Sequence, residues 1–321
     1  MKHKLSITLL LLGMFLVTQF IGLFVVNAYT PQTIFNQTTG NITLDTTSQL
    51  PFGIETPETN FLVIIFYFIL AFAIVAILMK YKWKLVIKLW FLLVIILALG
   101  ISFNAILKYS TLTNISIIAL VIAIPLALLK IFRSNVFIHN ITELLIYPGI
   151  AAVFVAILQP LTIVLLLVLI SIYDMWAVCR AKFMQKMAKF EMEELHIFGG
   201  FLIPTISKKV KDQIERIKQK YQGKKMPAKI KKKKFKVRLA MLGGGDVIFP
   251  IITAGVFMRA FPKQELFGIA GLIPALFIVF GALAGLTYLM LITKKDKAYP
   301  AMPYISTGIF AALILWRFLI L

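Results

Sequence analysis

Long runs of apolar residues alternate along this chain with short polar segments. Each run holds about 18 or more mostly apolar residues, and roughly 20 helical residues, rising about 1.5 Å each, cross the hydrocarbon core of a bilayer. The pattern therefore predicts nine membrane-spanning helices. Their approximate limits are 5–26, 61–79, 85–107, 114–132, 141–159, 160–179, 239–261, 266–292 and 300–321. Because Gln159 and Pro160 leave almost no connection, the fifth and sixth spans are expected to be adjacent and antiparallel.

The composition excludes an ordinary water-soluble fold. Hydrophobic residues make up 60% of the 321 residues and charged residues only 15%, with a mean hydropathy of +0.92. Average soluble domains are nearer half apolar and about a quarter charged. We therefore expect an all-α polytopic membrane protein, with the bilayer as its solvent.

Positive charge is concentrated in one long polar segment. The formal net charge is +21, and residues 180–238 alone hold 19 basic and 5 acidic side chains. We expect three parts: spans one to six in 1–180, a basic cytoplasmic loop in 181–238, and spans seven to nine in 239–321. Such a loop suits anionic lipid headgroups, and no nucleic-acid partner is expected. Within it, residues 208–222 have one apolar helical face, which fits either a helix on the membrane surface or a disordered linker.

The basic residues of the short connections predict the orientation in the membrane. Most of them occur in every second connection, at Lys2, Lys4, Lys80, Lys82, Lys84, Lys130, Arg133, Lys294, Lys295 and Lys297. Residues 27–60 contain no lysine or arginine. The positive-inside rule then places the N-terminus in the cytoplasm and the C-terminus outside the cell, in the plasma membrane. A cleaved signal peptide over 1–28 is the competing interpretation, but its apolar stretch of about 20 residues is too long.

Three acidic residues lie within predicted spans, where the cost of burying a carboxylate in the membrane has to be explained by a structural or functional role. An acid near the bilayer centre costs about 2.5–3.5 kcal/mol on insertion scales. Glu143 has a local explanation, because Asn140 at the start of the fifth span and Glu143 three residues later form a capping-box pattern. Asp174 and Asp246 have no such explanation.

Asp174 and Asp246 are expected at the same depth in the membrane. Asp174 lies six residues before Arg180 and Asp246 eight residues after Arg238, which puts both about 9–12 Å inside the cytoplasmic boundary. Two carboxyls facing each other there share one proton, because low dielectric and like charge oppose double ionisation. This is the state of an aspartic protease dyad, in which one carboxylate activates water and its protonated partner polarises the carbonyl. A proton- or cation-coupled transporter could bury the same pair.

Three glycines, Gly243, Gly244 and Gly245, precede Asp246. Each glycine costs a helix about 1 kcal/mol relative to alanine, so the seventh span is a poor helix where it carries its acid. The glycines also remove side chains from the approach to the carboxyl and make an extended backbone accessible. Close packing by small residues would explain the glycines but not the costly acid that follows them.

These residues resemble a known family. Tyr173-Asp174, the Gly-Gly-Gly-Asp sequence ending at Asp246, and Pro300-Ala301-Met302 are similar to the YD, GxGD and PAL motifs of the presenilin and signal peptide peptidase family of intramembrane aspartyl proteases. The resemblance implies a horseshoe of nine membrane helices. It also implies that Asp174 and Asp246 are catalytic and that the Pro-rich start of the ninth span lies beside them and helps to hold substrate.

The chain resembles both branches of this family. The cytoplasmic N-terminus is similar to presenilins, whereas residues 246–250 resemble the peptidase branch, so we expect a separate, archaeal-type homologue. Met302 stands where the family has leucine, an exchange of similar volume that should be tolerated. Pro274-Ala275-Leu276 spells the third motif literally but lies inside the eighth span, where we expect Pro274 to kink a buried helix. Prepilin peptidases also use a Gly-x-Gly-Asp acid, but nothing else in the chain favours them.

The resulting prediction is an aspartic endopeptidase that hydrolyses peptide bonds within the transmembrane helices of other proteins, including signal peptides. The residues expected to bind substrate or shape the site are Tyr173, Gly243, Gly244, Gly245, Pro300, Ala301, Met302 and Pro303. Tyr173 could instead anchor the membrane interface. The three histidines lack ligand spacing and Cys179 is the only cysteine, so no metal or other cofactor is expected. A transporter using the acid pair and an inactive scaffold are the alternatives.

Overall fold

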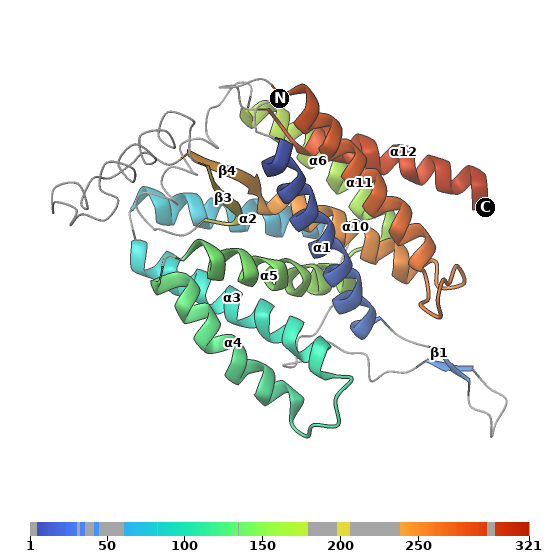
Figure 1. Ribbon diagram of the computed structural model, residues 1–321, viewed down its shortest axis with the longest axis horizontal. Coiled ribbons are helices and arrows are strands. Elements are labelled where there is room, and N and C mark those ends of the chain that lie inside the picture. Colours follow the sequence, from blue (N-terminus) through green and yellow to red (C-terminus); the bar gives the residue numbers. More distant parts are fainter. Residues whose placement is uncertain are drawn as a thin grey trace, which may run out of the picture.

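The structure, a computed structural model, describes residues 5–30, 33–35, 42–44, 61–81, 83–133, 135–178, 198–205, 238–293 and 299–320. These residues form nine helices and two short two-stranded sheets (Figure 1). The helices are α1 (Leu5–Tyr29), α2 (Phe61–Lys80), α3 (Lys84–Leu107), α4 (Ile115–Phe132), α5 (Val136–Ile157), α6 (Pro160–Trp176), α10 (Gly244–Ala260), α11 (Leu272–Ile292) and α12 (Met302–Ile320). The strands are β1 (Thr33–Phe35), β2 (Ile42–Leu44), β3 (Gly200–Thr205) and β4 (Arg238–Gly243). Residues 208–222, with their predicted surface helix or linker, lie outside the described ranges.

Most of the described helices have the length and composition of membrane spans. Six of them are long and apolar enough to cross a bilayer, namely α1, α3, α4, α5, α11 and α12. A mostly helical membrane protein is thereby confirmed, the two short sheets depart from the predicted all-α class, and the full set of nine crossings stays a prediction. α6 and α10 have 17 residues each. At about 26 Å of helix, each is short for a hydrocarbon core of about 30 Å.

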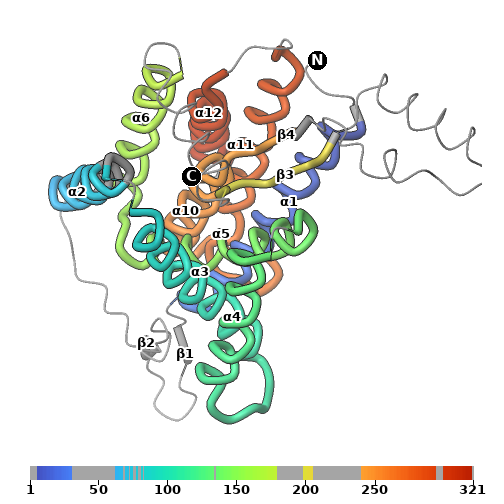
Figure 2. Tube along the Cα trace, turned by 90° about the vertical axis from the view of Figure 1, so that its left-hand side faces the viewer, coloured from blue at the N-terminus to red at the C-terminus, as the bar shows by residue number. Residues whose placement is uncertain are grey.

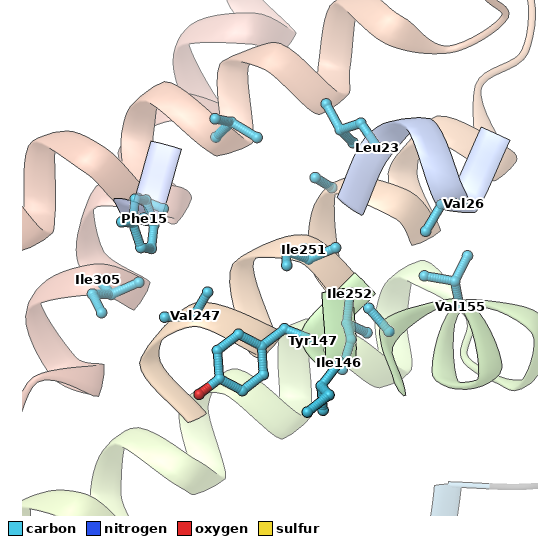
Figure 3. Packing of buried hydrophobic residues seen from close by; sticks show 14 of the residues in the cluster. Phe15, Leu23, Val26, Ile146, Tyr147, Val155, Val247, Ile251, Ile252 and Ile305 are labelled. Atoms are coloured by element: carbon cyan, nitrogen blue, oxygen red, sulfur yellow. The ribbon is translucent and has the colours of Figure 1, made fainter. Parts of the chain in front are cut away.

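The helices pack in two groups around a central pair. α3, α4 and α5 lie together on one side and α6, α11 and α12 on the other, with α1 and α10 between them (Figure 1). Figure 3 shows part of this centre, where Phe15 of α1, Tyr147 of α5 and Ile251 of α10 belong to one buried cluster. The core therefore joins the two groups through α10, which carries Asp246 in its first turn.

α11 and α12 approach each other closely through glycines. A side chain at Gly308 would meet the backbone oxygen of Gly281, and one at Gly285 would meet the backbone of Tyr304. Small residues let membrane helices pack backbone to backbone, which matters because lipid gives helix association no hydrophobic driving force. This packing holds the first turns of α12, which begins at Met302.

Two of the predicted helix starts are wrong. The seventh apolar run begins as strand β4, and α10 starts only at Gly244, because the run of glycines allows an extended backbone in place of helix. The eighth helix begins at Leu272 rather than near residue 266, so Pro274 lies in its first turn. The expected interior kink at Pro274 is therefore wrong, since a first-turn proline gives up an N–H that has no helical partner.

The predicted capping box at the start of the fifth span is also wrong. α5 starts at Val136, and the side chain of Asn135 accepts a hydrogen bond from the N–H of Phe137 at 2.9 Å. Asn140 and Glu143 lie inside the helix, where they make contacts with other elements instead. Asparagine followed by glutamate therefore does not by itself distinguish a helix cap from a tertiary contact.

Cationic side chains stabilise the C-terminal ends of two helices. Arg259, in the last turn of α10, donates from Nη1 to Ala156 O at 2.7 Å and from Nη2 to Leu158 O at 2.8 Å. Lys108 donates to Ala28 O in the last turn of α1 at 2.7 Å. The last carbonyls of a helix lack helical partners and carry partial negative charge. These contacts therefore stabilise the ends of α5 and α1.

We expect Arg259→Met to lower the free energy of unfolding by about 1.5–3 kcal/mol, because two carbonyls at the end of α5 lose a charged donor. Arg259→Lys keeps the charge but not the two-pronged geometry and should lose less. Thermal unfolding of the purified protein in detergent measures both changes. The exposed Arg317 in the last turn of α12 is the control, and Arg317→Met should leave the transition where it is. An unchanged transition for Arg259→Met would contradict the assignment.

Candidate active site

Asp174 is buried in the last turn of α6, where it contacts the start of α12. Its side chain is 7% exposed, and its Oδ2 accepts a hydrogen bond from the N–H of Met302 at 3.1 Å. The N–H of Ala301 also faces this carboxylate. The first N–H groups of a helix have no helical partner and carry partial positive charge. Asp174 thus finds backbone donors in a place where it is almost fully buried.

The sequence around Met302 explains why α12 begins beside Asp174. Pro303 is the second residue of the helix, and a proline loses nothing at a helix start because its N–H would have no helical acceptor. The N–H groups of Tyr304 and Ile305 both donate to Ala301 O and close the first turn. Met302 therefore supplies the remaining first-turn donor, and Asp174 accepts its hydrogen bond.

Only one of the two proline motifs reaches the acids. Pro274 lies in the first turn of α11, and Gly271 just before it packs against the backbone of Met258. Met258 follows Asp246 by twelve residues, or roughly 18 Å along α10. Pro274 therefore lies at the opposite end of α10 from Asp246, whereas Pro300 directly precedes the residues that contact Asp174.

A second contact holds α12 against α6. Ser171 Oγ donates to Leu167 O at 2.7 Å, and its oxygen is left to accept a hydrogen bond from Ser306 Oγ at 2.9 Å. Ser171 precedes Asp174 by about one helical turn, and Ser306 follows Met302 by about one turn. Two contacts one turn apart fix both the height and the rotation of α12 relative to α6.

Asp246 occupies the first turn of α10 and is partly buried. It lies close enough to Asp174 for the two carboxyls to interact electrostatically. Its Oδ2 is 3.1 Å from the position that a Cβ at Gly243 would take, and the N–H of Gly243 faces the carboxylate. Each carboxylate therefore lies beside the N-terminus of a helix, where negative charge is stabilised. Asp246 belongs to the first turn of α10, and Asp174, from the last turn of α6, contacts the first turn of α12.

Strands β3 and β4 form an antiparallel pair that leads directly into α10 (Figure 2). Gly200 is opposite Gly243 and Leu202 is opposite Met241. One further bond, from Gly244 N–H to the oxygen of residue 199 at 3.1 Å, continues the pairing into the helix. The extended backbone made accessible by the glycines is confirmed as far as Gly243. The strand pair thus fixes the chain just before Asp246.

Side chains of α5 cover the outer edge of β3. Asn140 Nδ2 donates to Leu202 O at 2.8 Å, and Asn140 Oδ1 accepts from Leu202 N–H at 3.0 Å. Because the backbone groups of Leu202 point toward α5, those of Met241 opposite point the other way, to the outer edge of β4. Among the described strands, none pairs with that edge. Within the part of the chain that the structure describes, the pair therefore has one covered edge and one open edge.

An apolar cavity adjoins the glycine before Asp246. It has a volume of about 140 Å³ and lies between α5, α6 and α10. Its lining consists of Ile150, Phe154, Leu158, Leu166, Gly245, Ile248, Phe249 and Ile252. An apolar cavity of this size accommodates one ring or one branched side chain.

Tyr173, the predicted neighbour of the acid pair, is exposed on α6. Its ring centroid lies 6.3 Å from that of Trp176. This placement fits an interfacial anchor, and a role of the Tyr173 hydroxyl in the acid pair stays a prediction. Within the described ranges, no group of three or more His, Cys, Asp or Glu side chains could hold a metal ion.

Sequence reasoning missed a row of polar side chains on α5. His139, Glu143 and Tyr147 follow one another at intervals of four residues, which places them on one face of the helix. His139 contacts Gly200 of β3, and Tyr147 lies against Gly244 at the start of α10. The spacing itself is the signal, because polar residues that repeat every fourth position within a span indicate a face in contact with protein.

The arrangement of the two acids is suited to hydrolysis. Two carboxyls that share a proton can act together, one as a general base toward water and the other as a general acid toward a carbonyl oxygen. Asp174 is held by backbone donors, and Asp246 is partly accessible beside an open strand edge and an apolar cavity. The site therefore combines an acid pair with surfaces that can hold an extended apolar peptide.

Comparison with known proteins agrees with this geometry. Residues 44–319 match the family model described as signal-peptide peptidase, presenilin aspartyl protease. Two solved structures of a presenilin family intramembrane aspartate protease have the same fold. The one in space group C222 has a TM-score of 0.60 and 19% identity, covering 97% of this chain and 99% of that chain. The one in space group P2 has a TM-score of 0.56 and 19% identity, covering 96% of each chain.

No curated protein sequence matches. The resemblance found in the motifs is confirmed, and the chain belongs to the signal-peptide peptidase and presenilin family of aspartyl proteases.

Proposed function

We propose that Asp174 and Asp246 are the catalytic dyad of an aspartic endopeptidase that cuts peptide bonds within membrane-spanning helices. The observation that carries this proposal is the proximity of two carboxyls at the starts of α10 and α12 inside an apolar helical protein. Membership of the signal-peptide peptidase and presenilin family supports the same chemistry. Signal peptides and other single transmembrane helices are the proposed class of substrate.

In the proposed reaction the two carboxyls hold one proton between them. The ionised carboxyl takes a proton from water as the water oxygen bonds the substrate carbonyl carbon, and the protonated carboxyl gives its proton to the carbonyl oxygen. The product of this step is a tetrahedral diol. One carboxyl then protonates the amide nitrogen while the other takes a proton from a diol hydroxyl. The C–N bond breaks, and the dyad returns to its starting state with one proton.

The open edge of β4 offers a place for the unwound substrate. A helical substrate hides its carbonyls in its own hydrogen bonds, so cleavage requires local unwinding and new partners for the freed backbone groups. Addition of an extended peptide to a strand edge supplies such partners. The backbone of Met241 points to this edge, and the strand ends three residues before Asp246. The apolar cavity beside Gly245 is placed to receive a substrate side chain next to the bond that is cut.

The membrane arrangement predicted from the sequence forms part of the proposal. It comprises nine crossings in a horseshoe in the plasma membrane, a cytoplasmic N-terminus and an external C-terminus. Residues 181–238 would lie against anionic lipid headgroups, between the spans in 1–180 and those in 239–321. Asp174 ends α6 and Asp246 begins α10, so both acids lie toward the side of this segment. Water would therefore reach them from the cytoplasm.

Replacing either acid with asparagine should abolish cleavage of a membrane-spanning peptide, because loss of one member of an acid–base pair slows the reaction by about 100- to 10,000-fold. Purified protein is incubated with a peptide containing one transmembrane segment, and fragments are identified by mass spectrometry. Glu265→Gln, which changes an exposed carboxylate, is the control and should cleave normally. Proteolysis that survives Asp174→Asn or Asp246→Asn would refute the dyad, and acid-dependent cation uptake without fragments would indicate the transporter.

Pro300 and Pro303 should be needed for cleavage, whereas Pro274, in the Pro-Ala-Leu sequence of α11, should not. Pro300→Ala combined with Pro303→Ala frees the backbone before α12 and should reduce cleavage, because Asp174 loses its fixed donors. We expect a fall in kcat of about tenfold or more, since small misplacements of catalytic groups are costly. Pro274→Ala, in the first turn of α11, is the matched control and should retain full activity. Equal activity of the double variant and the unaltered protein at equal expression contradicts the assignment.

Removing one backbone donor tests the open edge of β4. Met241→Pro deletes an N–H that points away from β3, so the β3–β4 pairing should survive. Loss of one hydrogen bond to substrate, about 1 kcal/mol, should raise KM or lower kcat/KM by about fivefold. Met241→Ala keeps the N–H and is the control. If Met241→Pro and Met241→Ala cleave a transmembrane peptide equally well, substrate does not pair with this edge.

A further inference from the structure

One face of α5 carries a buried polar row that no step of the proposed reaction uses. The row consists of His139, Glu143 and Tyr147, with Lys130 of α4 joined to it; we call these four residues the α5 polar row. Lys130 Nζ lies 2.5 Å from Glu143 Oε1, and their side chains are 4% and 3% exposed. A charge in a membrane span is costly unless paired. Buried ion pairs often contribute no more to stability than apolar side chains of similar volume, so stability alone does not explain this pair.

His139 connects the ion pair to strand β3. Its Nε2 lies 2.7 Å from Gly200 O, which can only accept, so Nε2 carries the proton and donates. Its Nδ1 lies 3.4 Å from Lys130 Nζ and is then left to accept from the ammonium group. The imidazole is thereby fixed in one tautomer and one orientation. With the two bonds from Asn140 to Leu202, α5 holds the covered edge of β3 at three points.

Tyr147 connects the same row to the glycines before Asp246. Its ring packs edge-on against Phe201 of β3, with centroids 5.5 Å apart, and lies beside the first turns of α10 (Figure 3). A Cβ at Gly244 would come within 3.0 Å of both Cε1 and the hydroxyl oxygen of Tyr147. Gly244 is therefore the residue that admits this ring against the backbone.

The hydroxyl of Tyr147 is buried, and among the described residues it has no hydrogen-bond partner. It nevertheless lies within electrostatic reach of both Glu143 and Asp246. A buried hydroxyl without a partner is destabilising, which favours a hydrogen bond to a neighbouring acceptor. Glu143, four residues before Tyr147 on the same face of α5, is the carboxylate placed to accept a hydrogen bond from this hydroxyl, whereas Asp246 interacts with it only electrostatically.

We propose that the α5 polar row positions the active site: it anchors β3 from behind and holds the turn at Gly244, so that Asp246 stays within reach of Asp174 while substrate occupies β4. The proposal rests on the proposed catalytic role of Asp246. His139 and Tyr147 act through the strand pair and the glycines and are therefore positioning residues. An anchor on the covered edge is needed because β3 and β4 have no third strand among the described residues, and a two-stranded sheet is only marginally stable when a substrate strand binds its open edge.

The first test compares two replacements of His139. Glutamine can donate from its amide to Gly200 O and accept from Lys130, whereas leucine has similar bulk and can do neither. His139→Leu should lower kcat for a transmembrane peptide by about tenfold or more, with little change in KM, because a displaced acid slows chemistry rather than binding. His139→Gln should restore most of the loss. A purely structural role predicts that both variants, measured per folded molecule, keep normal kcat, and that result would overturn the proposal.

Hydrogen exchange tests the anchor independently of proteolysis. In detergent, the amides of Phe201, Leu202 and Gly244 should exchange faster in His139→Leu than in the unaltered protein or in His139→Gln, since the strand pair loses its support. Unchanged exchange overturns the proposal whether or not the chain cleaves anything. If Asp174→Asn and Asp246→Asn leave proteolysis intact, the proposed dyad fails, and the exchange measurement still decides whether the row anchors β3.

Tyr147→Phe provides a second test of the proposal in case the His139→Leu protein does not fold. It removes one oxygen and keeps the ring against Phe201 and Gly244, so the fold should persist. We expect kcat to fall by about threefold or more at unchanged KM, because the α5 polar row loses the hydroxyl that joins Glu143 to the turn at Gly244. A kcat equal to that of the unaltered protein removes Tyr147 from the proposal and leaves its hydroxyl without function.

Discussion

A carboxylate persists inside a membrane protein only where polar groups rather than lipid surround it, and here the starts of two helices supply such groups. Asp174 takes the first-turn amide of α12, and Asp246 lies in the first turn of α10. Neither helix can begin elsewhere without leaving an acid unsolvated. Gly243 and Gly244 end strand β4 and allow α10 to begin just before Asp246. Pro300 and Pro303 flank the residues at which α12 begins beside Asp174. The two acids come within electrostatic reach of each other because α12 is held against α6 by the Ser171–Ser306 contact and α10 also packs against α6.

The same requirement brings a strand into an otherwise helical protein. A chain that is to start a helix at Gly244 has to arrive in a non-helical conformation, and its backbone groups then need partners that lipid does not offer. β3 supplies them on one side, and side chains of α5 supply partners for β3 in turn. These contacts form a chain through the protein. The Lys130–Glu143 pair contacts His139, His139 bonds to β3, and β3 pairs with β4, which leads into the helix of Asp246.

Much of the chemistry could be predicted from sequence because buried acids are costly. Asp174 and Asp246 stood out against an apolar background, and the glycines and prolines near them carried the family resemblance. Helix boundaries were harder, because the apolar residues of β4 look like the continuation of a span and periodicity does not separate a short buried strand from helix. Asn140 and Glu143 matched a local cap but make contacts with β3 and α4. The contact from Met302 to Asp174 spans 128 positions, and no local pattern encodes a pairing at that separation.

The hydrogen bond from Met302 to Asp174 comes from the main chain, and this has a bearing on how such a protein changes over evolutionary time. Any amino acid other than proline presents the same N–H group, so mutation of residue 302 does not remove the donor. The side chain there has only to fill its buried space, which methionine does as well as leucine. Selection acting through Asp174 is therefore expected to weigh on the neighbouring prolines, which set the path of the chain, and to leave residue 302 room to drift among apolar residues of similar size.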